Sequence, residues 1–569
     1  MLESREDQMI ETAHAEPWRS MYTRAERAFQ FDSAGAPDIT EFLDDLTSFS
    51  ERDSCSIVLP NGASATLSYN EVDAYSDAFA RFLIDRYDIQ TGDVVAMQAP
   101  NCLAYVIALF ATLKAGGIVS NVNPLYTASE TLHQIDDCQA KILIGADLFA
   151  DRIGEISDAR PDLEIVLVSL FEFFPAPRRA VYSALLRYIK RALPKADFKH
   201  ATFRDALRHG HLSDTPLAGR ARAGDEVSFY QYSGGTTGRS KGVELTASGL
   251  LGNIEQCALL SDPATPGDNH CCLLALPMYH MFGLFMCASV MRRGGHVVLI
   301  PSPRPISNMR KAFEKFSPTI FPGVNTLFAR LLNENWFQAS PPQSIQVTYT
   351  GATALDPDVA ARWKKLTGSK IGEAYGMTEA TCVLTMTPLD DRHRAGTVGL
   401  PLPGVDIRIV DAIGNDCPTG APGEILARGP QVMLRYHGHS DTEGFVDGWL
   451  KTGDVGSLDE QGFLTIHDRV KDMLLVSGFN VFPAEVEEVI TSCDGVLEAG
   501  VVGTACAETG EQVVAFVVRS NPAQTEDQIM AHCREHLAAY KCPKIIRFID
   551  ELPKSPVGKV LRRELRDMA

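Results

Sequence analysis

A glycine-rich stretch, residues 232–242, constrains this chain more than any other part of it. It reads YSGGTTGRSKG and holds four glycines, two serines, two threonines and a lysine. Glycines let several backbone N–H groups point at one site and let a ligand approach closely. The hydroxyls and Lys241 add donors and positive charge. The stretch therefore predicts a cradle for a phosphate chain, although such a loop, considered alone, is also typical of a flexible hairpin without a ligand.

The stretch is not a Walker A loop. That loop ends in Gly-Lys-Ser/Thr and connects a strand to a helix, whereas Lys241 here is followed by Gly242. An apolar run, residues 227–232, leads in, and a short segment, residues 242–246, leads out. This pattern predicts a strand, a loop and a second strand, with a helix only over about residues 248–260.

The composition is that of a large soluble protein. Its 569 residues are 45% hydrophobic and 22% charged, a length that favours more than one domain. The net charge of −19 argues against a general nucleic-acid binder, which is normally basic. The first residues, MLESREDQ, lack the features of a signal peptide. The thirteen cysteines form no C-x-x-C pair, so we expect a cytoplasmic protein without a zinc site or disulfides.

One apolar stretch, residues 271–291, has two interpretations. It carries no charged residue and is followed by Arg292 and Arg293, as a membrane span would be. However, Pro277 and Gly283 divide it into a strand-like CCLLAL and a helix-like MFGLFMCASVM. Because a buried strand and a core helix have the same hydropathy, we predict these two elements instead of a span.

Alternating helical and strand patterns predict an α/β fold. A helical pattern begins at Ser68, with Glu71 in position to complete a capping box, and short apolar runs at residues 118–121 and 141–144 predict strands. Such alternation favours a largely parallel sheet with helices on both faces.

The last hundred residues predict a small α+β module. We expect three parts, namely a polar, loosely held lead-in over residues 1–40, a large domain over 41–468 and a small domain over 469–569.

A basic segment, residues 178–199, stands out in this acidic chain. It carries seven basic residues and one acidic residue, Asp197, and apolar residues recur between them at helical spacing. The basic residues are Arg178, Arg179, Arg187, Lys190, Arg191, Lys195 and Lys199. The segment is typical of an amphipathic helix that rests on anionic lipid. A solvated helix packed on the protein body through its apolar side is the alternative.

Motifs spread over more than three hundred residues resemble those of the adenylate-forming superfamily, which includes acyl-CoA synthetases, luciferases and peptide-synthetase adenylation domains. They are YSGGTTGRSKG (232–242), LPMYHMFGL (276–284), YTGATAL (349–355), EAYGMTEA (373–380), DGWLKTGD (447–454), DRVKDMLLVSGFNVFP (468–483) and LPKSPVGKVLRREL (552–565). The runs NVNPLYT (121–127), GVNTLF (323–328) and GPQVMLRY (429–436) resemble bacterial long-chain fatty acid–CoA ligases in particular. The resemblance implies a large adenylate-forming domain with mixed sheets and flanking helices, followed by a small mobile α+β domain.

The resemblance also implies an ATP site. Tyr375 would stack on adenine, Asp454 and Arg469 would hold the ribose, and Glu379 with Thr236 would bind Mg²⁺, a cation that prefers oxygen ligands. The complete set of implied ATP-binding residues is Ser233, Gly234, Gly235, Thr236, Thr237, Gly238, Lys241, Gly351, Ala352, Glu373, Tyr375, Gly376, Thr378, Asp454, Arg469 and Lys559.

The acid substrate would lie beside the ATP site. By resemblance, His280 lies near the carboxylate of the acid, and Gly323 and Val324 line the acyl pocket. By spacing alone, His280 is more typical of a core histidine, and residues 319–332 of a core helix and its approach.

The small domain would supply the remaining catalytic groups. By resemblance, Lys559 reaches across to the acid and the α-phosphate, Lys471 is the hinge, and Gly478 leaves room for the pantetheine arm of CoA. Without the resemblance, Lys559 would be read as a surface lysine in a Pro/Gly turn. A flexible point charge such as Lys559 can act at a distant site only if its domain moves.

The implied activity is ATP-dependent ligation of a fatty acid to CoA through an acyl-adenylate, with Lys559, Lys241, Glu379, Gly478 and His280 as catalytic groups. A medium-chain or aryl acid ligase, and an adenylation module that loads a carrier protein, share these motifs. Three departures from the long-chain pattern, at Ser233, at residues 351–353 and at Val470, leave the acyl preference open. The expected partners are the acid, ATP and CoA, with possible peripheral membrane contact and a possible homodimer.

Overall fold

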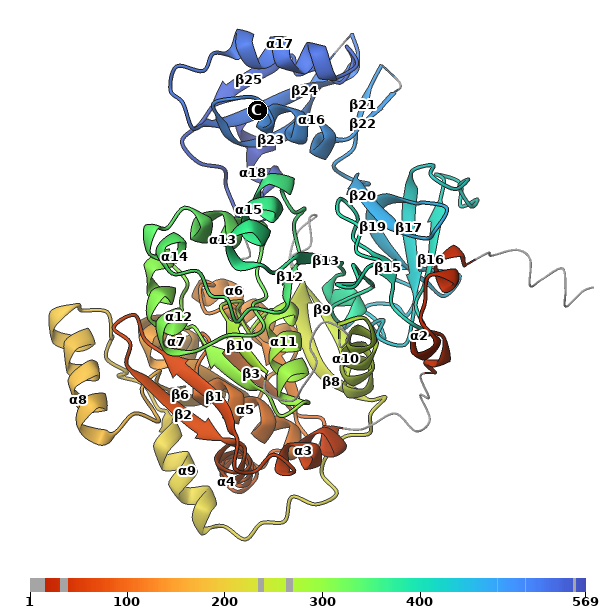
Figure 1. Cartoon of the computed structure of the whole chain (residues 1–569). Helices are drawn as coiled ribbons and strands as arrows, with labels where there is room; N and C mark the ends of the chain where they lie inside the picture. The colour runs from red at the N-terminus through yellow and green to blue at the C-terminus, as the bar shows by residue number, and fades with distance from the viewer. Residues whose placement is uncertain are drawn as a thin grey trace, which may run out of the picture.

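The computed structural model describes residues 16–30, 39–233, 240–261, 270–477, 479–506, 508–555 and 559–569. The chain forms a large N-terminal body of several sheets with flanking helices, and a smaller α+β part lies at one end of it (Figure 1). The buried hydrophobic clusters lie either within residues 18–464 or within residues 474–565. The predicted fold class is confirmed.

A seven-stranded sheet occupies the centre of the large body. Its strand order is β7-β6-β5-β3-β4-β8-β9, and all neighbours are parallel except β8 and β9. The strands are β3 (Val94–Gln98), β4 (Ile118–Asn121), β5 (Ile142–Ala146), β6 (Glu164–Val168), β7 (Ala201–Thr202), β8 (Val227–Ser233) and β9 (Lys241–Thr246). The associated helices are α4 (Tyr69–Tyr87), α5 (Leu103–Lys114), α6 (Ala128–Asp137), α7 (Ala150–Ala159) and α9 (Phe203–Leu212). Strands β3, β4 and β5 are buried at every position, as expected for a parallel sheet covered on both faces.

The glycine-rich stretch lies between the two antiparallel strands of this sheet. Ser233, the last residue of β8, pairs with Lys241, the first residue of β9. Helix α10 (Ala247–Ser261) follows β9 directly. The two predicted strands and the later helix are confirmed, and Ser233 and Lys241, which flank the loop, are register partners in the β8–β9 pairing.

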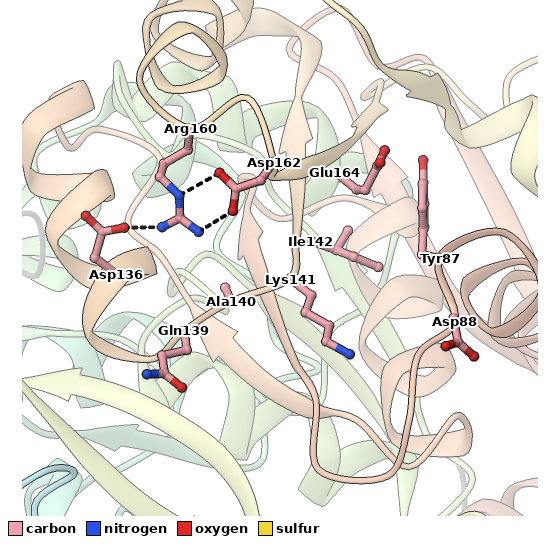
Figure 2. Close-up of a pocket in the computed structure, with 10 residues that line it drawn as sticks. All are labelled: Tyr87, Asp88, Asp136, Gln139, Ala140, Lys141, Ile142, Arg160, Asp162 and Glu164. Carbon is pink, nitrogen blue, oxygen red and sulfur yellow. Dashed lines mark hydrogen bonds and ion pairs between the residues drawn. The ribbon is translucent and has the colours of Figure 1, made fainter.

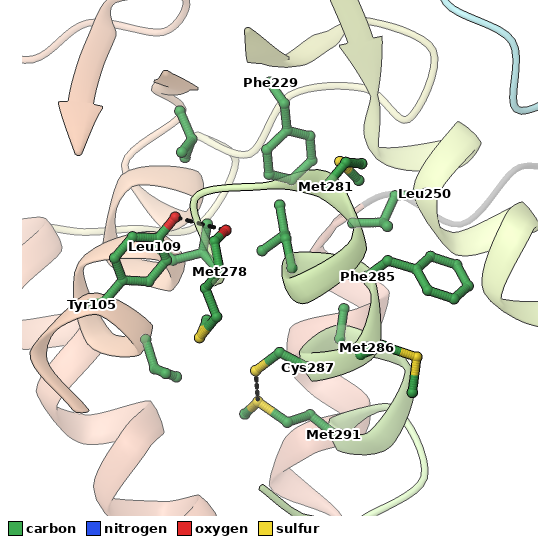
Figure 3. Close-up of a cluster of buried hydrophobic side chains, with 14 of the residues drawn as sticks. Tyr105, Leu109, Phe229, Leu250, Met278, Met281, Phe285, Met286, Cys287 and Met291 are labelled. Atoms are coloured by element: carbon green, nitrogen blue, oxygen red, sulfur yellow. Dashed lines mark hydrogen bonds between the residues drawn. The ribbon is translucent and has the colours of Figure 1, made fainter. Parts of the chain in front are cut away.

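The apolar stretch at residues 271–291 forms a strand and a core helix, as predicted. Strand β10 (Cys271–Leu274) belongs to a four-stranded sheet of order β10-β11-β1-β2, and helix α11 (Met281–Met291) packs in the main core. The other strands are β11 (His296–Leu299), β1 (Asp53–Val58) and β2 (Ser64–Ser68). Figure 3 shows α11 beside side chains of α5, β8 and α10, where the Tyr105 hydroxyl donates to the Met278 carbonyl at 3.1 Å. Over the described residues, no helix combines the length and the apolarity that a membrane crossing requires.

Two smaller sheets complete the large body. One has the order β12-β13-β14-β15, and the other is antiparallel with the order β16-β17-β19-β18 and β20 paired to β19. Their strands are β12 (Thr348–Thr350), β13 (Ile371–Tyr375), β14 (Thr385–Met386), β15 (Leu400–Pro401), β16 (Asp406–Val410), β17 (Gly423–Arg428), β18 (Phe445–Val446), β19 (Trp449–Leu458) and β20 (Leu464–Arg469). The neighbouring helices are α12 (Arg310–Lys315), α13 (Asn325–Leu332), α14 (Asn335–Ala339) and α15 (Pro357–Thr367).

The C-terminal part is built on a five-stranded sheet. Strands β22, β21, β24 and β23 lie in this order, and β25 pairs in parallel with β24. The elements are β21 (Leu474–Val476), β22 (Phe479–Val481), α16 (Pro483–Thr491), β23 (Val496–Cys506), β24 (Gly510–Arg519), α17 (Glu526–His536), β25 (Ile545–Phe548) and α18 (Arg562–Met568). Apolar residues of β24 point to both faces and belong to two separate clusters, so the sheet has a packed layer on each side.

Residues 16–30, which fall within the stretch predicted as a loosely held lead-in, are packed on the large body. A short 3₁₀ turn (Pro17–Ser20) and helix α2 (Arg24–Ala28) pack on the large body, and Trp18 is buried. The Tyr22 hydroxyl donates to the Pro401 carbonyl at 2.6 Å. Glu26, also buried, forms a bidentate ion pair with Arg392. These partners are more than 360 residues away in sequence, so local polarity gave no sign of them. Helix α3 (Ile39–Thr47) follows.

Candidate active site

Glu379 lies at the centre of the candidate site. It belongs to a short 3₁₀ turn (Thr378–Ala380) that follows β13 and is buried. Its Oε1 accepts hydrogen bonds from the Ser233 hydroxyl at 3.1 Å and from the Tyr436 hydroxyl at 3.0 Å. Ser233 is the residue at which the glycine-rich stretch leaves β8. The carboxylate is therefore held directly beside the entrance of that stretch.

Lys241, at the other end of the stretch, is positioned by the same tyrosine. Its Nζ lies 5.1 Å from the centroid of the Tyr436 ring, which is within cation–π range. The same Nζ forms an ion pair with Glu443. Glu443 also accepts from His439 at 2.8 Å. Tyr436 thus bridges the acid and the base of the site, since one tyrosine contacts both Glu379 and Lys241.

A second group of predicted residues meets at Asp454. This aspartate is buried in β19, and β20 places Arg469 opposite it in the register. Arg469 Nε lies 2.8 Å from Asp454 Oδ1, and the Tyr375 hydroxyl donates to Asp454 Oδ2 at 2.7 Å. Burial, with the charge of Asp454, raises the pKa of Tyr375 well above its ordinary value. The phenol therefore stays protonated and remains a donor to the carboxylate.

The backbone around Tyr375 requires small residues. A Cβ on Gly376 would lie 1.8 Å from the Cys382 carbonyl oxygen, so only glycine fits there. Ala352 has a φ of 68°, in the left-handed region that non-glycine residues seldom adopt, and Gly351 lies beside the Phe282 ring and the Ala374 carbonyl. Burial raises the pKa of Glu373, on the same strand as Tyr375, to about 7. The backbone at Gly351, Ala352 and Gly376 can therefore come close to a ligand bound beside Tyr375.

His280 is partly buried and has one ring nitrogen without a partner among the described residues. It precedes the first residue of α11, and its Nε2 is buried without a hydrogen-bond partner in the described part of the chain. Burial lowers the pKa of His280 to about 4, so the ring is neutral at physiological pH. Buried polar atoms are usually satisfied, and an unpartnered ring nitrogen here fits a group brought by a substrate.

The residues predicted for the acyl pocket are packed closely. A Cβ on Gly323 would lie 2.8 Å from the Phe328 ring, and Val324 precedes α13 and is partly buried against two core clusters. Such packing is found both in the wall of a pocket and in the hydrophobic core. The structure therefore does not decide between the two interpretations of Gly323 and Val324 that the sequence left open.

The C-terminal lysine lies in the electrostatic neighbourhood of the Asp454 group. Loss of surrounding water lowers the pKa of Lys559 to about 8, and the cations of Arg469 and Lys471 act in the same direction against the opposing charge of Asp454. By relative surface, Lys559 and Lys471 are both exposed. Lys559 thus interacts electrostatically with Arg469, Asp454 and Lys471.

An ionic network ties the C-terminal part to the end of β20. Arg562 donates to Asp468 Oδ1 at 2.9 Å and to Glu487 Oε2 at 2.8 Å. Asp468 Oδ2 also accepts from the backbone N–H of Ala484, in the first turn of α16, at 2.7 Å. Burial raises the pKa of Glu487, although Arg562 opposes this shift. Arg562 in turn contacts Asp472 at 3.4 Å, so charges on both sides of Lys471 are linked.

Several predicted residues lie outside the described part of the chain. They are Gly234, Gly235, Thr236, Thr237, Gly238 and Gly478. The two flanking residues of the loop, Ser233 and Lys241, are described, as is Thr378, which is partly buried beside Glu379. The predicted Mg²⁺ ligand pair is thus represented by Glu379 alone. One buried carboxylate fits this cation, because Mg²⁺ is commonly held by one or two carboxylates together with substrate phosphates.

Two residues of the site were missed by the sequence reasoning. Tyr436 and Glu443 contact Lys241, and Tyr436 also contacts Glu379. Tyr436 ends the run GPQVMLRY, which carried a family resemblance but no assigned role. Glu443 follows a polar turn that has no distinctive pattern.

A polar hollow of about 600 Å³ lies elsewhere on the surface, and none of the predicted site residues line it. Figure 2 shows its lining, where Arg160 is bound by Asp136 and Asp162. Because the guanidinium is already paired, the hollow does not offer a free cation for phosphate. The candidate active site is therefore the Glu379–Lys241–Asp454 region.

Comparison with known proteins adds sequence relatives to this geometry. Residues 47–437 match the family model described as AMP-binding enzyme, and residues 485–559 match that described as AMP-binding enzyme C-terminal domain. A long-chain-fatty-acid–CoA ligase of Escherichia coli O6:H1 is 40% identical over 88% of this chain and 90% of its own length. The ligase of the same name from Bacillus subtilis is 34% identical over 84% of this chain and 86% of its own length.

Solved structures agree with this similarity. ATP-bound MatB from Rhodopseudomonas palustris matches 94% of this chain and 99% of its own chain, with a TM-score of 0.79 and 28% identity. The anthranilate CoA ligase AuaEII, in complex with anthranoyl-AMP, has a TM-score of 0.79 at 24% identity over 95% of this chain and 99% of its own, which shows the likeness of the fold alone.

Proposed function

The chain belongs to the AMP-binding enzymes of the adenylate-forming superfamily, and from this premise we propose that it joins a long-chain fatty acid to CoA. It is an acid–thiol ligase that uses ATP and forms an acyl-adenylate. The acid, its chain length and the roles of individual residues are the proposed part.

The observation that carries the proposal is the pair of groups that meets at Tyr436. Glu379 contacts Ser233, where the glycine-rich loop begins, Lys241 lies where the loop ends, and both Glu379 and Lys241 contact this one tyrosine. A carboxylate and a cation placed at the two ends of a glycine-rich loop suit a metal-bound triphosphate. The Tyr375–Asp454–Arg469 group then supplies an aromatic ring and a buried carboxylate for the nucleoside.

In the first half-reaction, an oxygen of the acid's carboxylate attacks the α-phosphorus of ATP, and the bond to the departing pyrophosphate breaks. Lys241 and the loop N–H groups would stabilise the negative charge on the phosphates, and Lys559 would approach the α-phosphate. Mg²⁺, held by Glu379, would supply further charge neutralisation. Neutral His280 would donate or accept a hydrogen bond near the carboxylate without adding charge to it.

In the second half-reaction, the thiol of CoA attacks the acyl carbon, loses its proton and displaces AMP. We propose that the C-terminal part rotates about Lys471 between the two steps, withdrawing Lys559 and bringing Gly478 to the site. Conformational steps of this kind are common within enzyme turnover.

A long-chain acid is favoured by the relatives, since ligases with that name align over most of this chain. A medium-chain acid, an aryl acid, or a carrier protein as the thiol acceptor would use the same catalytic groups. A 4-coumarate–CoA ligase-like protein from rice is 30% identical over 95% of this chain and 94% of its own length. This similarity supports an aryl acid as the alternative substrate. We place the enzyme in the cytoplasm, where ATP and CoA are supplied.

The test is CoA-dependent release of AMP from ATP and Mg²⁺ with acetate, octanoate, palmitate, oleate and a cinnamate. Strong turnover with palmitate and oleate, and little with acetate or cinnamate, is the expected result. Turnover confined to cinnamate or acetate would overturn the substrate and keep the mechanism. Adenylate formation without CoA-dependent turnover would instead favour a carrier-protein acceptor.

A further inference from the structure

Helix α8 (Ala176–Ala184), with the π-helical turn that continues it (Leu185–Ile189), projects from one side of the large body (Figure 1). One side of this element is anchored. The Tyr182 ring packs 5.4 Å from the ring of Phe171 and 5.8 Å from that of Phe174, and Leu186, one turn further on, also contacts the main core. The element is thus fixed to the protein along a narrow strip, and the rest of it faces outward.

The outward side carries an apolar stripe. Val181 and Leu185 are one helical turn apart, and Tyr188 and Ile189 occupy the following turn. Their exposed fractions are 63%, 36%, 75% and 74%, respectively. Val181 lies in α8, and Leu185, Tyr188 and Ile189 lie in the π-helical turn that continues it, so four exposed apolar side chains follow one another along one element. Isolated exposed apolar residues are ordinary, but a continuous stripe marks an interaction surface.

Basic residues surround the stripe. Arg178, Arg187, Lys190, Arg191 and Lys195 are exposed, and Arg179 is partly so. No ion pair joins any of these six cations to an acid within the described ranges, although Arg187 does act electrostatically on Asp147. Elsewhere in this chain of net charge −19, arginines such as Arg160, Arg392, Arg428 and Arg562 are paired with acids. The charge left uncompensated on α8 and its extension is therefore positive.

We propose that this surface, the apolar stripe of α8 and the π-helical turn together with the six cations around it, docks on an anionic lipid bilayer. Apolar side chains flanked by lysine and arginine are the signature of a helix lying in the plane of a membrane interface. Tyr188 suits this position, because a tyrosine ring has an apolar body and a polar tip. The cations would attract the headgroups and orient the element.

A second copy of this chain is a poorer occupant. In a twofold contact through this surface, each set of six cations would face the same set on the other copy. A nucleic acid or a soluble anion would use the charge but would leave the aliphatic stripe in water. The bilayer satisfies both halves of the surface. Membrane binding itself does not depend on the proposed function. Only its benefit rests on that function, because an enzyme that takes a long-chain acid from a membrane works more effectively when it is bound there.

The experiment is co-sedimentation of the full-length protein with phosphatidylcholine vesicles, with and without about a quarter of phosphatidylglycerol. No substrate or ATP is present, so the result is independent of the enzyme's activity. We expect binding to the anionic vesicles at least about tenfold tighter than to neutral ones, and weakening as salt rises toward about 0.5 M, where charge is screened. The absence of binding to anionic vesicles at low salt would overturn the proposal.

Two variants locate the surface. The triple variant R187E/K190E/R191E is expected to weaken binding to anionic vesicles at least about tenfold, and Y188S/I189S to weaken it several-fold at every salt concentration. Matched controls are K364E/K365E, two exposed lysines on α15, and L212S/I413S, which removes two apolar side chains that are 90% and 84% exposed. Unchanged binding of both α8 variants, or equal losses in the controls, would assign any membrane binding to another part of the protein. Melting temperatures close to that of the wild type establish that each variant folds.

Discussion

The Tyr436 hydroxyl donates a hydrogen bond to Glu379 Oε1 at 3.0 Å, while the ring of the same tyrosine lies 5.1 Å from Lys241 Nζ. The carboxylate and the cation belong to segments 138 positions apart in the chain, and the tyrosine comes from a third segment. Burial and the nearby charge of Glu379 raise the pKa of Tyr436, so its hydroxyl remains a donor. A single side chain therefore sets the relative position of the two charged groups.

The first prediction concerns that hydroxyl. Tyr436→Phe keeps the ring under Lys241 but removes one of the two donors to a buried carboxylate, an interaction worth about 1.5–3 kcal/mol. We expect ATP-dependent pyrophosphate exchange to fall by at least about tenfold, with a higher Mg²⁺ requirement. Tyr230→Phe, at a buried tyrosine of β8, is the control and should change little. Unaltered exchange in Tyr436→Phe would separate Glu379 from the phosphate chemistry.

The second prediction concerns pH and Lys559. Its pKa of about 8 lies below the ordinary lysine value of about 10.4. The cation is therefore complete below about pH 7 and is lost as pH rises through 8. If that charge assists adenylation, pyrophosphate exchange falls above pH 8 in the wild type. Lys559→Arg should retain some exchange with no such fall, because a guanidinium stays charged.

The matched change for Lys559→Arg is Lys554→Arg. Lys554 lies on the same segment and pairs with Glu498, so its replacement should leave the pH profile as it is. Lys559→Ala should lose exchange while a preformed acyl-adenylate still reacts with CoA. Parallel loss of both half-reactions would argue for a structural role of Lys559.

The third prediction concerns the stability of the loop that carries Tyr436. His437 Nδ1 lies 2.9 Å from the buried Glu244, and this hydrogen bond raises the pKa of His437. Burial acts to raise the pKa of Glu244, but His437 and Arg435 outweigh it, and the net shift is downward. The histidine's contribution is complete below its unfolded pKa of about 6.5 and is lost as pH rises through the higher folded value. The carboxylate's contribution is complete above its unfolded pKa of about 4.3 and is lost as pH falls through the lower folded value.

Melting curves test this pair. As pH rises above about 6, the wild type should lose stability more steeply than His437→Gln, because only the wild type loses the charged histidine of this pair. His209→Gln, at an exposed histidine beside Asp85, is the control and should follow the wild type. Parallel slopes in the wild type and His437→Gln would mean that the pair does not contribute to the pH dependence of stability.

The fourth prediction concerns Arg562. Its side chain is 17% exposed and that of Asp468 only 1%, so Arg562→Ala leaves a buried carboxylate without its cation. Loss of one partner of a buried pair typically costs about 3–5 kcal/mol. We expect limited proteolysis to cut the C-terminal part of Arg562→Ala sooner than that of the wild type. Arg563→Ala, at the adjacent residue, which is exposed, should behave as the wild type does. Equal cutting of both variants would show that the network does not hold this part in place.

The parts of the fold that local pattern determines were predicted correctly. Ser68 and Glu71 form the expected reciprocal cap at 2.9 and 3.2 Å, because a capping box depends on four consecutive residues. The apolar stretch at residues 271–291 divides at Pro277 as expected, since proline and glycine interrupt a helix wherever they occur.

Contacts between distant segments were not predictable in this way. Glu26 is buried only because Arg392 meets it, and nothing near Glu26 in the sequence indicates that partner. Tyr436 and Glu443 likewise acquire their place from a fold that brings β9 and the loop after β17 together. Residues assigned by family resemblance, such as Asp454 and Arg469, do lie opposite each other, and their roles stay predictions until the variants are measured.

The buried position of Asp468 bears on the timing of turnover. Its two oxygens hold Arg562 and the start of α16, so this residue of β20 is attached to both parts of the chain at once. If the C-terminal part rotates about Lys471, three residues later, either these bonds break or the end of β20 moves with it. On the proposed rotation, this ionic network would hold one of the two arrangements, and the rate at which it breaks would limit how often the enzyme passes from one to the other.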